Sequence, residues 1–169
     1  ALTPDGSLYT ANLRTAKATD TFVCSGGKDT FVPRFTYHGF RYVSIAGMGG
    51  NPPLDAFTAL VLGTDAAATA QFSCSSPLVN RLWANIVWGQ RSNFVDVPTD
   101  CPQREKNGWT ADAALSAEHT LLYFAPERCY HEWLRNIRGS QAPDGSLPGI
   151  VPTAGWGFAW GNGPAWDCV

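Results

Sequence analysis

The sequence predicts an antiparallel β-sandwich in residues 1–74, followed by a helical segment in residues 75–169. Two observations support this division. Short runs rich in β-branched and aromatic residues, separated by turn residues, fill the first part. Near Ser76 the hydrophobic residues change to the spacing of a helix. Hydrophobic residues make up 44% of the chain, which is enough to build a packed core.

Six runs in the first part are expected to be strands, and they read LYTANLR, DTFVC, FVPRFTY, FRYVSIA, FTALVLG and TAQFSC. Turn residues lie between them, for example at residues 4–6 and 49–53. Strands of this length at this spacing are typical of an antiparallel sandwich.

Three helices are expected in the second part. The first begins at Pro77 with Ser76 as its N-cap. The second covers residues 111–123, and the third follows Pro126. Each has an apolar stripe that must pack against another element, and three helices are too few to cover one another. We therefore expect uncovered apolar faces and marginal stability when the chain stands alone.

Composition narrows the classes of function. The net charge is -2 and the sequence has no basic block, which argues against nucleic-acid binding. No apolar run reaches 18 residues, so we expect a soluble chain without a membrane span. Residue 1 is Ala and no signal-peptide pattern follows it, so the true start is expected to be missing. Five widely spaced cysteines without a CxxC indicate neither a disulfide framework nor a zinc site, and no metal or cofactor is expected.

The stretch DCPQREKNGW, residues 100–109, concentrates ionisable and aromatic groups in a predicted loop. Hydrolysis of a glycosidic bond needs one carboxylic acid to protonate the leaving oxygen, and a second carboxylate as base or nucleophile. Asp and Arg grip sugar hydroxyls, and aromatic faces cover the C–H patches of the ring. The stretch and its sequel supply such residues, namely Asp100, Arg104, Glu105, Trp109 and Asp112. From residue types alone, a surface loop of ion pairs explains the same pattern.

Other chemistries have weaker support. Cys101 with His119 or His131 as base would be a nucleophile pair, but no local signature joins them. No G-x-S-x-G is present to indicate a serine hydrolase. The tail contains Trp156, Trp160 and Trp166, which fit either core packing or a wall on which a sugar stacks.

The segment VPTDCPQREKNGWTADA resembles the signature of bacterial α-L-rhamnosidases, glycoside hydrolase family 78. FTYHGFRYVSIAG is similar to the β-sandwich strands that precede the family's catalytic domain. FSCSSPLVNRLWANIVWGQRSNF resembles the first helix of the family's (α/α)6 barrel, and WLRNIRGSQAPDGSLPGIVP resembles the helix and loop after the signature. The resemblance implies a multidomain fragment, with part of a β-sandwich in residues 1–74 and the first helices of an (α/α)6 barrel in residues 75–169.

The resemblance also implies an inverting hydrolase that releases terminal α-L-rhamnose from a glycoside or oligosaccharide. Glu105 matches the general acid, and Asp100, Arg104, Trp109 and Asp112 match residues that line the sugar pocket. Three more residues lie in a segment similar to the next pocket-lining loop, namely Trp160, Trp166 and Asp167. Ala111 departs from the pattern, because many relatives have Gly there. The family's general base lies on a later barrel segment, so the fragment alone is expected to be inactive, and its oligomeric state stays open.

A general acid must hold its proton near neutral pH, and a nearby negative charge favours the protonated form. Arg104 and Lys106 flank Glu105, so we expect Glu105 to face the pocket beside Asp100 or Asp112. Two alternatives remain: a carbohydrate-binding module that uses the same pocket without catalysis, and another (α/α)6 hydrolase or lyase acting on a different sugar.

Overall fold

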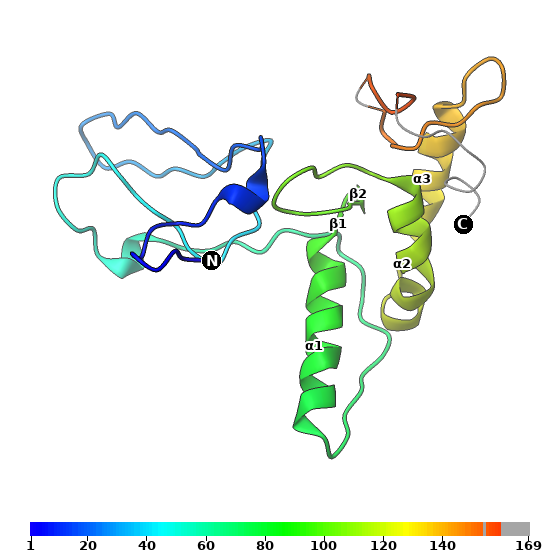
Figure 1. The fold of residues 1–169 in the computed structure, drawn as a ribbon, viewed down its shortest axis with the longest axis horizontal. Helices are drawn as coiled ribbons and strands as arrows, with labels where there is room; N and C mark the ends of the chain where they lie inside the picture. The colour runs from blue at the N-terminus through cyan, green and yellow to red at the C-terminus, as the bar shows by residue number, and fades with distance from the viewer. Residues whose placement is uncertain (154, 160–169) are drawn as a thin grey trace. The chain divides into compact units, whose positions relative to one another are not determined.

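The computed structural model describes residues 1–153 and 155–159 (Figure 1). The chain divides into two compact units. One contains Ala1–Leu62 with Pro102–Arg104, and the other contains Gly63–Cys101 with Glu105–Val169.

The first unit has little regular backbone pairing. Residues 1–62, all of which are described, contain the short 3-10 turns η1 (Ala11–Leu13) and η2 (Leu54–Ala56) and one isolated bridge between Leu2 and Leu8. The turn η1 interrupts the first predicted strand, because Leu13 N–H donates to Thr10 O at 2.9 Å. The other predicted runs in residues 1–62 carry no ladder. The predicted antiparallel sandwich is therefore not confirmed by the backbone pairing of these residues.

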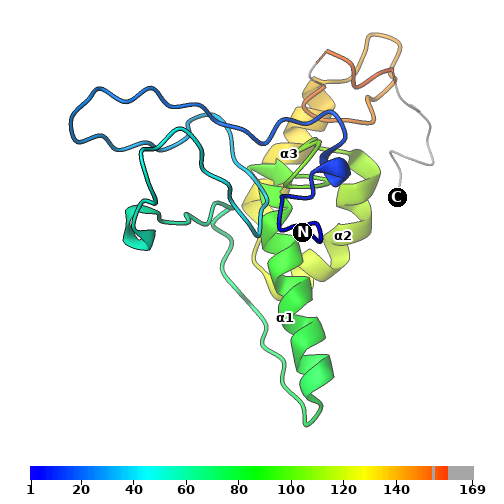
Figure 2. The ribbon, with the colours of Figure 1, turned by 60° about the vertical axis from the view of Figure 1, so that its left-hand side comes forward.

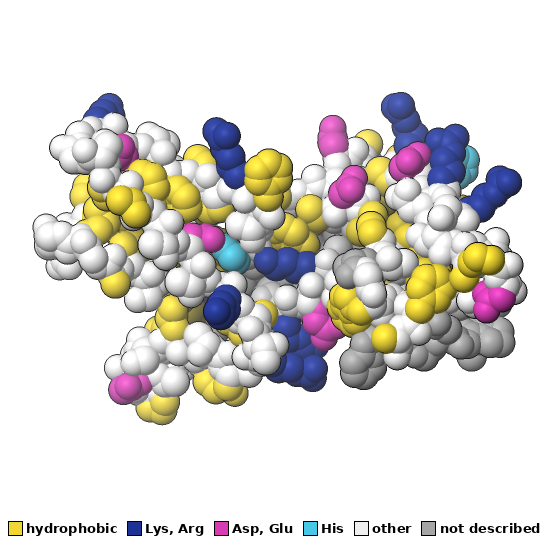
Figure 3. All heavy atoms as spheres, turned by 90° about the horizontal axis from the view of Figure 1, so that it is seen from above, with side chains coloured by type: hydrophobic (Ala, Val, Ile, Leu, Met, Phe, Trp, Pro, Cys, Tyr) yellow, Lys and Arg dark blue, Asp and Glu magenta, His cyan; other side chains and the backbone are white. Residues whose placement is uncertain are grey.

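The apolar side chains of the first unit remain accessible to solvent. No residue of Ala1–Leu62 is buried, and Val23, Leu54 and Val61 are 85%, 91% and 77% exposed. Figure 3 shows hydrophobic side chains, in yellow, in several patches on the surface seen in that view. A sandwich buries its alternate side chains between two sheets. In this unit the strand-forming residue types are present, and their apolar side chains are not covered by an opposing layer among residues 1–62.

The second unit begins its regular structure with α1 (Pro77–Ser92), as the spacing predicts. Pro77 is the first helical residue and Ser76 is the N-cap, but the Ser76 side chain makes no capping hydrogen bond. Instead, the Asn80 side chain holds the backbone that leads into α1, because it exchanges two 2.8 Å hydrogen bonds with the backbone of Cys74. The predicted apolar stripe is largely uncovered, since Leu78 and Leu82 are 80% and 56% exposed.

A hairpin that the sequence did not indicate follows α1. Strands β1 (Phe94–Val95) and β2 (Val97–Pro98) pair in antiparallel fashion around Asp96, whose φ is 67°. Thr64 Oγ1 accepts the Asp96 N–H at 3.0 Å and so holds this turn. The candidate loop starts directly after β2.

Two helices follow the loop, α2 (Thr110–Tyr123) and α3 (Glu127–Gly139), with a short connection between them (Figures 1 and 2). They pack around a small core formed by Ala113, Trp133 and Val151. The Trp133 indole N–H donates to Val151 O at 3.1 Å. Residues 148–151 are buried in full, although their Gly and Pro content predicts only a loop. Among the described residues, no helix combines the length and apolarity needed to cross a membrane.

Candidate active site

The loop between β2 and α2 is closed by hydrogen bonds at its base. Asp100 N–H donates to Asn107 O at 3.0 Å, and Asn107 N–H donates to the Asp100 carboxylate at 2.9 Å. Lys106 N–H donates to Cys101 O at 3.1 Å, and Lys106 takes a φ of 57° to allow this. These contacts bring Asp100 and Glu105 to the same side of the loop base.

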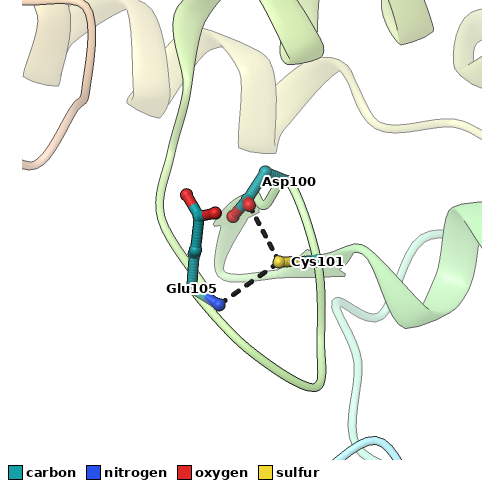
Figure 4. A group of neighbouring side chains, drawn as sticks. All are labelled: Asp100, Cys101 and Glu105. Atoms are coloured by element: carbon teal, nitrogen blue, oxygen red, sulfur yellow. Dashed lines mark hydrogen bonds between the residues drawn. The ribbon is translucent and has the colours of Figure 1, made fainter. Parts of the chain in front are cut away.

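Cys101 joins these two acidic residues (Figure 4). Its thiol donates to Asp100 Oδ2 at 2.8 Å, and its sulfur accepts the Glu105 N–H at 3.2 Å. Sγ and one carboxylate oxygen from each acid all lie within 4.8 Å of one another. A donor set of this kind is close enough to hold a metal ion. Burial, and then the hydrogen bond to Asp100, raise the pKa of the Cys101 thiol, so the sulfur is a proton donor rather than the thiolate that binds metals.

Trp109 completes the contacts of Glu105. Its indole N–H donates to Glu105 Oε2 at 3.0 Å. The backbone of Trp109 forms an antiparallel bridge with Ile150, which fixes the end of the loop against a buried segment. The ring meets Trp156 edge-on, with centroids 6.2 Å apart and planes at 81°. Glu105 therefore lies between the Asp100 carboxylate and an indole donor.

Asp112 lies in the first turn of α2 and belongs to the same electrostatic neighbourhood. Desolvation, then the charge of Asp100 and more weakly that of Glu105, raise the pKa of the Asp112 carboxyl. The negative charges of Asp100 and Glu105 thus favour the protonated form of Asp112.

The structure brings together Asp100, Glu105, Trp109 and Asp112 within the second unit. Glu105 lies beside Asp100, which is one of the two aspartates next to which it was expected. Arg104 belongs to the first unit. Trp160, Trp166 and Asp167 lie outside the described residues. A cavity of about 680 Å³ elsewhere in the second unit is lined by parts of α3 and residues 63–65, and by none of the four grouped residues.

One contact of the site was left open by the sequence, and one was missed. Trp156, which the sequence allows either in core packing or in a sugar-stacking wall, meets the ring of Trp109. Gly108 lies so close to Val151 that an added Cβ would come within 2.0 Å of the Val151 carbonyl oxygen. This contact between Gly108 and Val151 joins residues about 40 positions apart, so no local sequence pattern indicates it.

Comparison with known proteins supplies the family. Residues 67–169 match the bacterial α-L-rhamnosidase 6-hairpin glycosidase domain, and residues 1–63 match the bacterial α-L-rhamnosidase concanavalin-like domain. An α-L-rhamnosidase of Streptomyces avermitilis is 44% identical over 94% of the chain, and one of Formosa agariphila is 36% identical over 92% of it. The chain spans only 16% and 18% of the length of these two relatives.

Solved structures agree with this assignment. An α-L-rhamnosidase from Dictyoglumus thermophilum superposes with a TM-score of 0.89 at 41% identity, covering 99% of this chain and 19% of that one. The S. avermitilis α-L-rhamnosidase, in complex with L-rhamnose, superposes with a TM-score of 0.83 at 44% identity, covering 90% of this chain and 15% of that one. The chain therefore belongs to the bacterial α-L-rhamnosidase family.

Proposed function

We propose that this chain carries the acid half of the catalytic site of an enzyme that releases terminal α-L-rhamnose from glycosides or polysaccharides. The position of Glu105, between the Asp100 carboxylate and the Trp109 indole N–H, is the observation that carries the proposal. Family membership and the L-rhamnose complex of a 44% identical relative support the choice of sugar.

The proposal gives each candidate site residue a chemical role. Glu105 protonates the departing glycosidic oxygen. Asp100 and Asp112 accept hydrogen bonds from sugar hydroxyls, and Trp109 offers its ring to a C–H face of the sugar. Arg104 is assigned to the same pocket on the family's pattern, as are Trp160, Trp166 and Asp167.

We propose inversion, with a base supplied by a part of the protein other than residues 1–169. Inverting enzymes separate their two carboxyl groups by roughly 6.5–9.5 Å to admit water. Carboxylate oxygens of Asp100 and Glu105 lie within 4.8 Å of each other, which leaves too little room. Both oxygens of Asp100 also accept hydrogen bonds, from Cys101 and from Asn107, so Asp100 is suited to binding rather than to activating water.

The rest of the fold is proposed on the same basis. Residues 1–74 would be part of a β-sandwich whose remaining strands pair with the unpaired runs and cover their exposed apolar side chains. Residues 75–169 would be the first helices of an (α/α)6 barrel, because α1 leaves its apolar stripe uncovered. The activity then belongs to the longer protein, since this chain spans about a sixth of its curated relatives.

The test is Glu105→Gln in the full-length protein, assayed for release of L-rhamnose. Loss of the acid should lower kcat by about 10²–10⁴-fold while substrate affinity stays close to that of the wild type. Glu118→Gln is the matched control, because Glu118 is exposed on α2 and has no assigned role. A Glu105→Gln protein with the rate of the control would contradict the proposal.

A retaining reaction with Asp100 as nucleophile is the second candidate, favoured only by the short separation of Asp100 from Glu105. The first anomer formed distinguishes the two by proton NMR. Inversion gives β-L-rhamnose first, and retention gives α-L-rhamnose first. Binding of rhamnose without any hydrolysis, in both the wild type and Glu105→Gln, would instead indicate a carbohydrate-binding module.

A further inference from the structure

Three short backbone segments of the second unit lie against one another and connect the core to the proposed acid. We propose that Gly108 is a positioning residue for Glu105. Because Gly108 has no side chain, the loop can pack closely against Val151, and this packing places the Trp109 indole against the Glu105 carboxylate. This inference rests on the proposed function, because it presumes that Glu105 is the acid.

The contact between the loop and the buried segment is made by backbone atoms. Val151 N–H donates to Gly108 O at 2.8 Å, and Thr110 N–H donates to Gly149 O at 3.0 Å. Trp109 and Ile150 face each other in the bridge between these two bonds. Ile150 and Val151 are both 0% exposed. The loop thus ends on a buried surface rather than on solvent.

Space, rather than backbone conformation, demands glycine at this position. A Cβ on Gly108 would lie 2.0 Å from Val151 O and 3.0 Å from its carbonyl carbon. No positive φ accompanies this position, unlike Gly145 or Gly155. Restoring ordinary contact, which begins at 3.4 Å, would require a shift of about 1.4 Å.

The buried segment is held on its other sides and resists that shift. Val151 O already accepts the indole N–H of Trp133, which is 6% exposed. Gly149 N–H donates to Gly157 O at 3.0 Å, and a Cβ on Gly157 would lie 2.8 Å from Ile150 O. The loop end carries hydrogen bonds between its own residues and the bridge to Ile150. Because the Val151 carbonyl is fixed by Trp133, we expect an added methyl group at position 108 to displace the loop rather than the core.

The displacement would act on Glu105 through Trp109. Trp109 follows Gly108 directly, and its indole N–H lies 3.0 Å from Glu105 Oε2. Because Trp109 adjoins position 108 and Glu105 lies three residues before it, the two side chains would shift unequally, and a relative shift of more than about 1 Å would break a hydrogen bond of this length. Misplacing a catalytic group by about 1 Å can lower the rate by about 10²-fold. Gly108 is not assigned a contact with substrate, and it acts only through the position of Trp109.

The experiment compares Gly108→Ala with Gly89→Ala in the full-length protein. Gly89 lies in α1 with nothing within 4 Å of an added Cβ, so its variant should keep the wild-type rate. Gly108→Ala should lower kcat by about 10²-fold with a much smaller change in KM. Trp109→Phe, which keeps a ring and removes the N–H, should cause little further loss in the Gly108→Ala background, because both changes remove one contact.

A second background guards against a variant that fails to fold. Trp133→Phe removes the donor that fixes Val151 O, so Gly108→Ala combined with Trp133→Phe should recover part of the lost kcat. Wild-type kcat in Gly108→Ala, alongside an inactive Glu105→Gln, would overturn the inference and leave the proposed function intact. Failure of both Gly108 variants to fold, with Gly89→Ala folded, would assign Gly108 to stability alone and also overturn it. Full activity in Glu105→Gln would instead reject the proposed function.

Discussion

Asp112 shows how a single residue of the site is tuned. A carboxylate in the first turn of a helix is ordinarily stabilised by the helix N-terminus. Here desolvation, followed by the charges of Asp100 and Glu105, outweighs that effect and raises the pKa of Asp112. Asp144 has the opposite balance, because hydrogen bonds from the Ser146 backbone and hydroxyl lower the pKa of its carboxyl.

These opposite shifts predict opposite effects on stability. A raised pKa in the folded state means that the favourable contribution of Asp112 is complete below its unfolded pKa and is lost as pH rises through the folded value. Asp112→Asn should therefore raise Tm at neutral pH, with the gain shrinking towards acid pH. For Asp144 the contribution is present above the unfolded pKa and lost as pH falls, so Asp144→Asn should lower Tm at neutral pH.

Thermal unfolding of both variants from about pH 3 to pH 8 checks the signs. A neutral-pH loss of stability in Asp112→Asn would show that the helix N-terminus, and not desolvation and like charge, decides the energy of this carboxylate.

At the scale of elements, the buried segment around Ile150 connects the loop, α2 and α3. Ile150 is 0% exposed, and its neighbours exchange hydrogen bonds with residues 108 and 110. Ile150→Ala should lower the free energy of unfolding by about 2–5 kcal/mol, as for other large-to-small changes in a core.

Urea denaturation of residues 1–169 measures this loss. Leu115→Ala is the control, because Leu115 is 74% exposed and its truncation should change stability by less than about 0.5 kcal/mol. Equal losses in the two variants would mean that the segment around Ile150 is not the core of the second unit.

The helices were predictable from the sequence and the buried segment was not. Hydrophobic spacing and Pro77 gave α1 its start, and α2 and α3 lie where their spacing places them. The spacing did not predict which face of α2 is buried, since Ala113 and Thr120 are covered while Leu115 and Leu121 are exposed. Residues 148–151 look like a loop because their burial depends on partners 40 positions away. The loop at residues 100–109 could be singled out because ionisable and aromatic residues crowd it, but residue types alone also fit a loop of ion pairs, and the family resemblance was needed to choose between them.

The whole chain is rich in exposed apolar surface. Large hydrophobic side chains are exposed in both units, from Val23 and Leu54 to Leu78 and Leu122. Exposure on this scale indicates a surface that another part of a protein covers. We expect residues 1–169 alone to bind a hydrophobic dye strongly and the full-length protein to bind much less. Equal dye binding per molecule would contradict the proposal that the longer protein covers these faces.

At the scale of the full-length enzyme, Glu105 is proposed to deliver a proton to the leaving oxygen. A general acid matters most when the leaving group is a poor one, because a stable phenolate departs without a proton. The direct measurement compares Glu105→Gln with the full-length wild type on an alkyl α-L-rhamnoside and on a dinitrophenyl α-L-rhamnoside. We predict a loss of about 10²–10⁴-fold on the alkyl substrate and a far smaller loss on the dinitrophenyl substrate. Equal losses on both substrates would contradict the assignment of Glu105 as the acid.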